Sequence, residues 1–372
     1  MQIHRVKSGE TLYSIAREYG VSPTKLIEIN QLKNPEKLTV GRELLILFPK
    51  RTYTARRGDT LEAISKRFSV EKEDILKNNP SLYGSEKLYP EEILALGYCD
   101  EKRGVALIDG YLYNDTSRDR LSLIMPYLSS LTVSSLLLEG GKLRRLFNFS
   151  SRELHNLGKR VSQRVYCPAP HSELLPEEKV ISSLTKAIKA DNRDAITLAL
   201  SGRMNENTIK FIKMLGESAK ESEISLYLEC GSEIPEDLST LFDRFIITDS
   251  AKLDSAFYQI FAERHGANKT MMDISPFAML GYKPIPINEA LLLADANMIE
   301  LERSEDGNML IGKVREKELT IPSLESIKAK LDLIGELGLL GASVDIMRCP
   351  LTVIMMLSSL YEINPSYFSG GM

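Results

Sequence analysis

The stretch Ser8-Gly-Glu-Thr-Leu12 recurs later in the same chain as Arg57-Gly-Asp-Thr-Leu61. The similarity continues beyond this motif, because Asn30 in the first copy matches Asn79 in the second at the same spacing. Self-similarity of this kind is typical of a duplicated structural unit. The N-terminal part of the chain is therefore predicted to hold two copies of one small module.

Each copy has the sequence pattern of a strand, two helices and a second strand. Gly9 permits a tight turn, and Thr11 and Thr60 stand where they can cap the helix that follows. Apolar residues then recur at helical spacing, and each copy closes on an apolar extended stretch, Glu43-Leu-Leu-Ile46 or Glu92-Ile-Leu-Ala95. We expect the two helices to cover one face of a two-stranded sheet.

This pattern resembles the LysM domain over nearly the full length of each copy. The resemblance implies that an N-acetylglucosamine-containing polymer lies in a shallow groove between the turn before the first helix and the loop before the last strand. Backbone amides and carbonyls of these loops would bind the N-acetyl groups, which offer both a donor and an acceptor. The glycan-binding residues implied are Gly9, Glu10, Thr11, Leu12 and Asn30 in the first copy and Gly58, Asp59, Thr60, Leu61 and Asn79 in the second.

A second interpretation is that these residues only form turns and cap helices. If both copies bind, the short link Phe48-Pro-Lys-Arg51 would raise the overall affinity through effective concentration. The second copy has Pro90 where the first has Gly41 in its closing turn. Proline fixes φ and lacks an amide donor, so the affinities of the two loops are expected to differ.

From about Asp100 onward, apolar strands alternate with amphipathic helices, as in an α/β protein with a parallel sheet. The expected strands are 105–108, 135–138, 164–167, 195–200, 224–228, 244–247, 270–274 and 341–346, and the clearest helices are 178–190, 207–219, 251–264 and 324–337. Eight strand–helix units over roughly 270 residues predict a (β/α)8 TIM barrel. An Asp-Gly turn flanked by residues 298–302 and 309–313 predicts a small antiparallel insert between strands 7 and 8. The expected domains are 1–48 and 51–97, both α+β modules, and 100–372, the barrel.

A barrel with this insert, following paired LysM modules, resembles the bacterial spore cortex-lytic and germination proteins of glycoside hydrolase family 18. The segment Ser323–Leu333, followed by Gly338-Leu-Leu-Gly341, is similar to the last helix and eighth strand of that family. The resemblance implies substrate-assisted hydrolysis, in which the substrate N-acetyl oxygen attacks the anomeric carbon and one Glu protonates the leaving oxygen. An Asp two residues before that Glu holds the acetamide.

The residues that carry this chemistry in the family are replaced in this chain. Where the family has D-G-V-N-I-D-F-E on the fourth strand, this sequence keeps Asp194 but has Ala199 for the acetamide-holding Asp and Ser201 for the acid Glu. Ser250 stands at the position of a Tyr that helps to hold the acetamide, and Asp345 at that of a Trp in the sugar pocket. These replacements predict a barrel without catalytic residues, a pseudoenzyme.

The alternative is an active N-acetylglucosaminidase that uses other carboxylates. Acidic residues fall at or near the ends of predicted strands, where barrel active sites lie, and they are Asp109, Glu139, Glu229, Asp249, Asp273 and Asp345. Asp273 and Asp345 are the candidate catalytic pair. They could equally form a solvated rim or pair with Lys and Arg.

Composition narrows the classes of protein and of binding partner that remain. Hydrophobic residues make up 43% and charged residues 26% of the 372 residues, which excludes disordered and fibrous proteins. The net charge of -4 is spread without long blocks, so neither nucleic acid nor an anionic membrane is an expected partner. The scattered cysteines and histidines have no metal-ligand or disulfide spacing, so we expect no metal, no cofactor and buried thiols.

The N-terminus shows no signal-peptide pattern, and no apolar run is long enough to span a bilayer. The resemblance then implies a protein of the spore cortex or coat, or otherwise of the cell wall, that is made without export. Expected partners are peptidoglycan or another N-acetylglucosamine polymer such as chitin and, in addition, spore-layer proteins.

Overall fold

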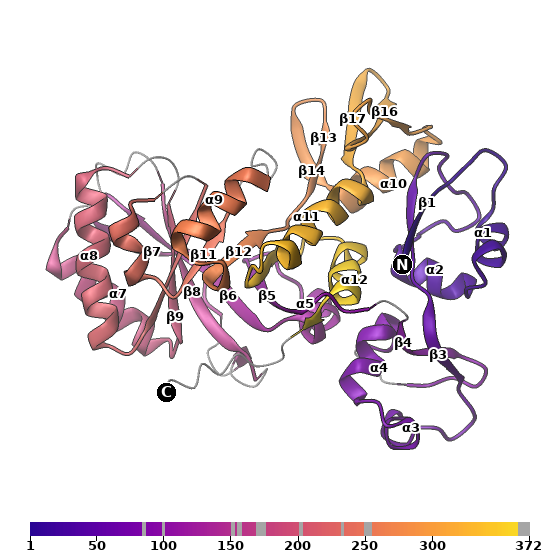
Figure 1. Ribbon diagram of the computed structural model, residues 1–372, viewed down its shortest axis with the longest axis horizontal. Helices are drawn as coiled ribbons and strands as arrows, with labels where there is room; N and C mark the ends of the chain where they lie inside the picture. Colours follow the sequence, from indigo (N-terminus) through magenta and orange to yellow (C-terminus); the bar gives the residue numbers. More distant parts are fainter. Residues whose placement is uncertain are drawn as a thin grey trace.

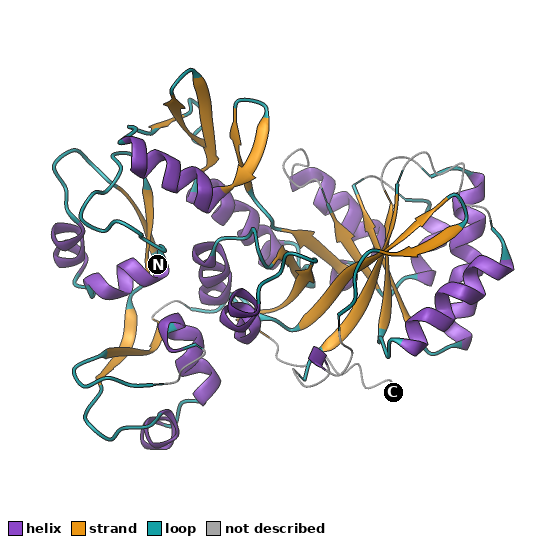
Figure 2. Cartoon of the chain, turned by 180° about the vertical axis from the view of Figure 1, so that it is seen from behind, coloured by secondary structure: helices purple, strands orange, loops and turns teal. Residues whose placement is uncertain are grey.

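A computed structural model describes residues 1–83, 87–98, 101–149, 153–154, 158–168, 176–200, 204–231, 234–248 and 255–363. Two small N-terminal modules lie at one end of the molecule and a larger barrel at the other, as Figures 1 and 2 show from opposite sides. An antiparallel insert extends from the barrel and stands beside the first module (Figure 1).

Both modules have the expected strand–helix–helix–strand order. Module 1 consists of β1 (Gln2–Arg5), α1 (Leu12–Tyr19), α2 (Pro23–Ile29) and β2 (Glu43–Ile46); module 2 of β3 (Pro49–Thr54), α3 (Leu61–Phe68), α4 (Lys72–Asn78), the 3-10 turn η1 (Pro80–Leu82) and β4 (Ile93–Tyr98). The two strands of each module pair antiparallel, and each module has a hydrophobic cluster of its own. Ile29, Leu45 and Leu47 of module 1 belong instead to the cluster of the barrel. Because β3 begins at Pro49, most of the expected link Phe48–Arg51 belongs to this strand.

The closing turns of the two modules align with a shift of one residue from the expected alignment. Gly41 has φ 83°, and the residue of module 2 with the same backbone is Glu91, at φ 68°. The amide of Gly41 bonds to the carbonyl of Val6, just as the amide of Glu91 bonds to that of Ala55. The expectation that Pro90 replaces Gly41 is therefore wrong, because module 2 has one extra residue before this turn.

Eight parallel strands form the barrel. They are β5 (Val105–Leu112), β6 (Ser130–Glu139), β8 (Arg160–Cys167), β9 (Ala195–Leu200), β10 (Ser225–Cys230), β11 (Arg244–Ile247), β12 (Thr270–Asp273) and β18 (Gly341–Asp345). Neighbours in this order are hydrogen-bonded, and β18 pairs with β5 to close the ring. The predicted TIM barrel is confirmed.

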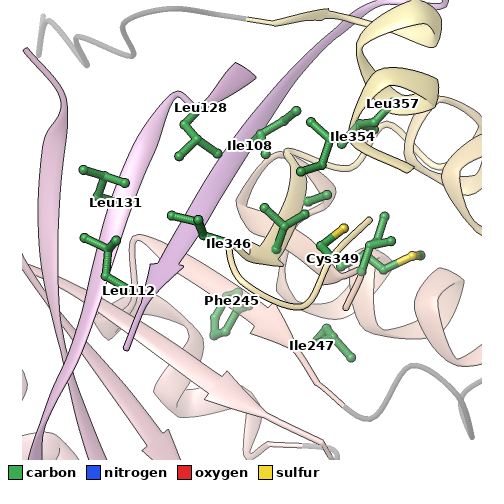
Figure 3. Packing of buried hydrophobic residues seen from close by; sticks show 14 of the residues in the cluster. Ile108, Leu112, Leu128, Leu131, Phe245, Ile247, Ile346, Cys349, Ile354 and Leu357 are labelled. Carbon is green, nitrogen blue, oxygen red and sulfur yellow. The ribbon is translucent and has the colours of Figure 1, made fainter. Parts of the chain in front are cut away.

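Helices cover the outside of the barrel. They are α5 (Arg118–Ile124), α7 (Glu178–Ala190), α8 (Glu206–Glu221), α9 (Ser255–His265), α11 (Leu324–Glu336) and α12 (Leu351–Leu360), with the 3-10 turns η2 (Met125–Tyr127), η4 (Glu236–Leu241) and η5 (Ala267–Lys269). All four expected helices have a counterpart, although residues 251–254 lie outside the described residues. Figure 3 shows the packing, in which Ile108 of β5 lies against Ile354 of α12.

The ring has two short additions. Strand β7 (Lys142–Arg145) pairs antiparallel with β6, and β19 (Glu362–Ile363) pairs parallel with β5. Among the described residues, no helix is both long and apolar enough to cross a membrane. The thiols of Cys167, Cys230 and Cys349 are buried as expected, whereas Cys99 lies outside the described residues.

The insert between β12 and β18 is larger than the predicted hairpin. It consists of β13 (Phe277–Leu280), β14 (Lys283–Pro286), α10 (Ile287–Asn297), β15 (Glu302–Arg303), β16 (Met309–Val314) and β17 (Lys317–Pro322). The strands form an antiparallel sheet in the order β14-β13-β17-β16-β15. The Asp-Gly turn joins β15 to β16 as predicted.

Candidate functional site

The acidic residue of each repeated motif holds its own turn together. Glu10 accepts a hydrogen bond from the backbone amide three residues earlier at 2.7 Å, and its carboxylate lies 2.8 Å from Nε2 of His4. Asp59 accepts the equivalent amide bond at 2.8 Å and a second bond from the Tyr53 hydroxyl at 2.7 Å. The amide bond, reinforced by Tyr53, lowers the pKa of Asp59.

The repeated asparagines are also structural. The side chain of Asn30 donates to two backbone carbonyls and accepts a bond from the amide of Leu45 at 2.7 Å. Asn79 repeats the pattern and accepts from the amide of Ala95 at 2.9 Å. Each buried amide group thus joins the end of the second helix to the last strand of its module.

The motif threonines are helix caps, as predicted. The Thr11 hydroxyl accepts from the amide of Ser14, and that of Thr60 accepts from the amide of Ala63. Each motif leucine is buried in the core of its module. These side chains therefore stabilise the fold of the modules.

The motif glycines lie where each turn has free space for a side chain. Gly9 and Gly58 have φ values of 81° and 91°, and an added Cβ would meet no atom within 4 Å at either position. The side-chain position of each motif glycine is therefore uncrowded.

One layer inside the barrel is polar. Asp109 accepts a bond from Thr132 at 2.6 Å; the Thr132 hydroxyl lies 2.8 Å from that of Ser162, which lies 2.7 Å from that of Thr197. Arg244 lies 3.7 Å from the Asp109 carboxylate. Asp109 is thus buried inside the barrel and does not reach the mouth, where sequence reasoning expected it. The cause is that β5 continues to Leu112, beyond its predicted end at residue 108, so Asp109 lies within the strand.

An ion pair lies inside the barrel between β8 and β10. The guanidinium of Arg164 donates two hydrogen bonds of 2.6 Å to the two carboxylate oxygens of Glu229, which also accepts from the Tyr111 hydroxyl at 3.1 Å. Both charged side chains are largely buried. Burial alone would lower the pKa of Arg164, but the bonds to Glu229 raise it above its ordinary value.

Ala199 lies in this layer of the barrel. It is paired with Tyr166 on β8 and with Glu229 on β10, and its side chain is buried. Asp194 lies just before β9, at the other end of the strand, where its carboxylate accepts a bond from the amide of Val161 at 2.7 Å. Ser201 and Ser250 lie outside the described residues, as does Asp249.

The two alternative catalytic carboxylates differ sharply in their surroundings. Asp345 accepts bonds from the amides of Met347 and Arg348 and forms an ion pair with the Arg348 guanidinium. Within the described residues, Asp273 accepts from the hydroxyls of Ser275 and Ser343, at 2.9 and 3.3 Å. Burial raises the pKa of Asp273 to about 7.

Sequence reasoning missed the tyrosines of the barrel mouth. Tyr111 and Tyr113 are stacked with their ring centroids 6.3 Å apart, and Arg348 lies over Tyr113. Arg164 lies over both Tyr111 and Tyr166. Alternation of these residues with apolar ones in the strands was the available signal. In the described part of the chain, no cluster of three or more His, Cys, Asp or Glu side chains is placed to hold a metal.

Residues 4–47 and 53–96 each match the family model of the LysM domain. The two modules are LysM domains. An endolysin of Bacillus phage B103 is 31% identical over 98 residues, 25% of this chain and 37% of the endolysin. A membrane-bound lytic murein transglycosylase D of Escherichia coli K12 is 34% identical over 88 residues, 21% of this chain and 20% of that enzyme. The chain thus spans well under half the length of these curated relatives.

Solved structures resemble the LysM domains and barrel together. The spore cortex-lytic enzyme SleL of Bacillus megaterium QM B1551 matches with a TM-score of 0.72 at 16% identity, covering 98% of this chain and 99% of SleL. A class V chitinase of Pseudomonas fluorescens Pf-5 matches with a TM-score of 0.60 at 15% identity, covering 68% of this chain and 99% of the chitinase. The expected fold, two LysM domains before a family 18-like barrel, is confirmed.

Proposed function

We propose that this protein binds the N-acetylglucosamine-containing polymer of the bacterial wall through its LysM domains, and that its barrel does not hydrolyse that polymer. Main-chain groups at the motif turns make the sugar contacts. The observation that carries the proposal is Ala199, a methyl group at the acetamide-holding position, beside a Glu229 that is already bound by Arg164.

The lost chemistry is large in energetic terms. A positioned general acid contributes about 10²- to 10⁴-fold in rate, which is about 3 to 5 kcal/mol of barrier. Ser201 stands at the acid position in the sequence, and a hydroxyl cannot protonate a leaving oxygen near neutral pH. Without an Asp at 199, the acetamide nucleophile also loses its orientation.

The place of action that fits this proposal is the spore cortex or coat. SleL, which shares the fold, is a spore cortex-lytic enzyme, and the endolysin and transglycosylase names also refer to wall lysis. Spore-layer proteins are the further partners we propose for the barrel surface.

Sedimentation with purified cortex peptidoglycan tests the binding. The full chain is expected to sediment with the polymer and to be released by soluble N-acetylglucosamine oligomers. A protein that stays in the supernatant at all polymer concentrations would contradict the proposal.

Asp273 supports a second candidate function, an N-acetylglucosaminidase with a relocated acid. A carboxyl group with a pKa of about 7 is half protonated at neutral pH and could protonate a leaving oxygen. Reducing ends released from muropeptides by the wild type, and lost in Asp273→Asn and Asp345→Asn, would favour this alternative.

Restoring the family residues at positions 199 and 201 tests whether the rest of the cleft is intact. The double variant Ala199→Asp with Ser201→Glu is expected to gain little turnover, because an aspartate at position 199 would stand beside Glu229 and compete for Arg164. A large gain would mean that the cleft is otherwise intact.

A further inference from the structure

The two LysM domains present their closing loops to different surroundings. The closing loop is defined here as residues 39–43 in module 1 and residues 89–93 in module 2, matched through Gly41 and Glu91. It forms one side of the groove in which the proposed function places the glycan.

The closing loop of module 1 is packed against the barrel insert. The amide of Leu301 donates to the carbonyl of Val40 at 2.9 Å. Gly41 approaches so closely that an added Cβ would lie 1.8 Å from the carbonyl oxygen of Leu301. A main-chain acceptor of this loop is therefore already used inside the molecule.

Buried charges fix this contact. Arg42 lies 2.6 Å from the carboxylate of Asp295, which also accepts from the Thr39 hydroxyl. Glu43 forms an ion pair with Arg303 and accepts from the amide of Leu324, the first residue of α11, at 2.6 Å. Separating module 1 from the insert would leave Arg42 and Glu43 without their partners.

The closing loop of module 2, in contrast, has large side chains that are exposed. Tyr89 stands where module 1 has Thr39, and 58% of its side-chain surface is exposed. Ile93 of the same loop is 43% exposed, although it stands where module 1 has the buried Glu43. The Lys87 ammonium lies 5.0 Å from the centroid of the exposed Tyr89 ring. An exposed tyrosine ring suits a pyranose, whose apolar face packs on aromatic rings.

We infer that module 2 alone holds the glycan, with Tyr89 as its contact surface, and that module 1 uses its closing loop to dock onto the barrel. This inference rests on the proposed function and changes one of its expectations. The chain binds one oligosaccharide and gains no affinity from duplication, because the two repeats have different tasks. The substrate class is an extended β-linked polymer of N-acetylated hexosamines.

Calorimetry with chitohexaose on the full chain tests the stoichiometry and the residue together. One oligosaccharide per chain is expected, and Tyr89→Ala is expected to weaken binding about tenfold or more. The matched control is Tyr13→Ala in module 1, since Tyr13 follows the first motif and is 69% exposed. It is expected to leave the affinity within about twofold.

The outcomes are distinct. Two bound oligosaccharides per chain, or a loss of affinity in Tyr13→Ala that equals or exceeds the loss in Tyr89→Ala, would overturn the assignment to module 2. Absence of binding by the wild type to both chitohexaose and cortex peptidoglycan would instead remove the proposed function itself. Circular dichroism of both variants is expected to match the wild type, because each side chain is exposed.

Discussion

Glu91 pays a conformational cost that Gly41 avoids. Both residues have a left-handed backbone, which costs a residue with a Cβ about 1 to 2 kcal/mol but is accessible to glycine. Replacing Glu91 with Gly is expected to stabilise module 2, because it removes the strain of the left-handed backbone. The gain is limited to about 1 kcal/mol, because glycine loses more entropy on folding. Hydrogen exchange at the Ala95 amide reports this change locally, as slower exchange in Glu91→Gly.

The reverse substitution at the matched position is the control. Gly41→Ala is expected to disturb the contact with Leu301, because the new Cβ would overlap the Leu301 carbonyl. Faster exchange at Ala95 in Glu91→Gly would show that the left-handed backbone at residue 91 is not strained.

Asp273 makes the stability of the barrel depend on pH. Its folded pKa of about 7 lies above the unfolded value of about 3.9, so the folded state binds the proton more tightly. This contribution to stability is complete below pH ~4 and is lost as the pH rises through ~7. Asp273→Asn is therefore expected to raise the melting temperature more at pH 8.5 than at pH 5. An equal shift at both pH values would mean that burial does not raise this pKa.

At the scale of elements, the apolar and polar positions of the barrel strands explain which strands the sequence could predict. The apolar positions identified eight strands and the main helices, because these side chains pack between the sheet and the helices around it. The first halves of β6 and β8 were missed, since inward residues such as Thr132 and Ser162 give them a mixed pattern. The Arg164–Glu229 pair was missed as well, because its partners meet only when the barrel closes.

The Arg164–Glu229 pair also joins two strands that are not neighbours, β8 and β10. Arg164→Ala would leave a largely buried carboxylate without its partner and is expected to cost about 3 to 5 kcal/mol. The double variant Arg164→Met with Glu229→Gln is expected to recover most of this loss. Urea unfolding of the wild type, of the single variants Arg164→Met and Glu229→Gln, and of the double variant measures the coupling between the two residues. A double variant as unstable as Arg164→Ala would show that the barrel needs the charges themselves.

For the whole molecule, the contact between module 1 and the insert predicts that they behave as one body. Asp295→Ala removes the counterion of the buried Arg42 and is expected to weaken the contact by about 3 kcal/mol. Small-angle scattering would then report a larger radius of gyration, and proteolysis between module 1 and the barrel would be faster. Asp74→Ala, which breaks an exposed pair with Lys77 in module 2, is the matched control and is expected to change neither. Unchanged scattering and proteolysis in Asp295→Ala would indicate that apolar packing alone holds module 1.

The function that we propose for the whole molecule is wall-glycan binding with a barrel that does not hydrolyse the glycan. Incubation with cortex muropeptides in ¹⁸O-labelled water tests this most directly, because each hydrolysed linkage would take up one labelled oxygen at its new reducing end. Mass spectrometry is expected to find no labelled ends, even when the protein concentration equals that of the muropeptides. Labelled ends that form with the wild type and disappear with Asp273→Asn would contradict the account.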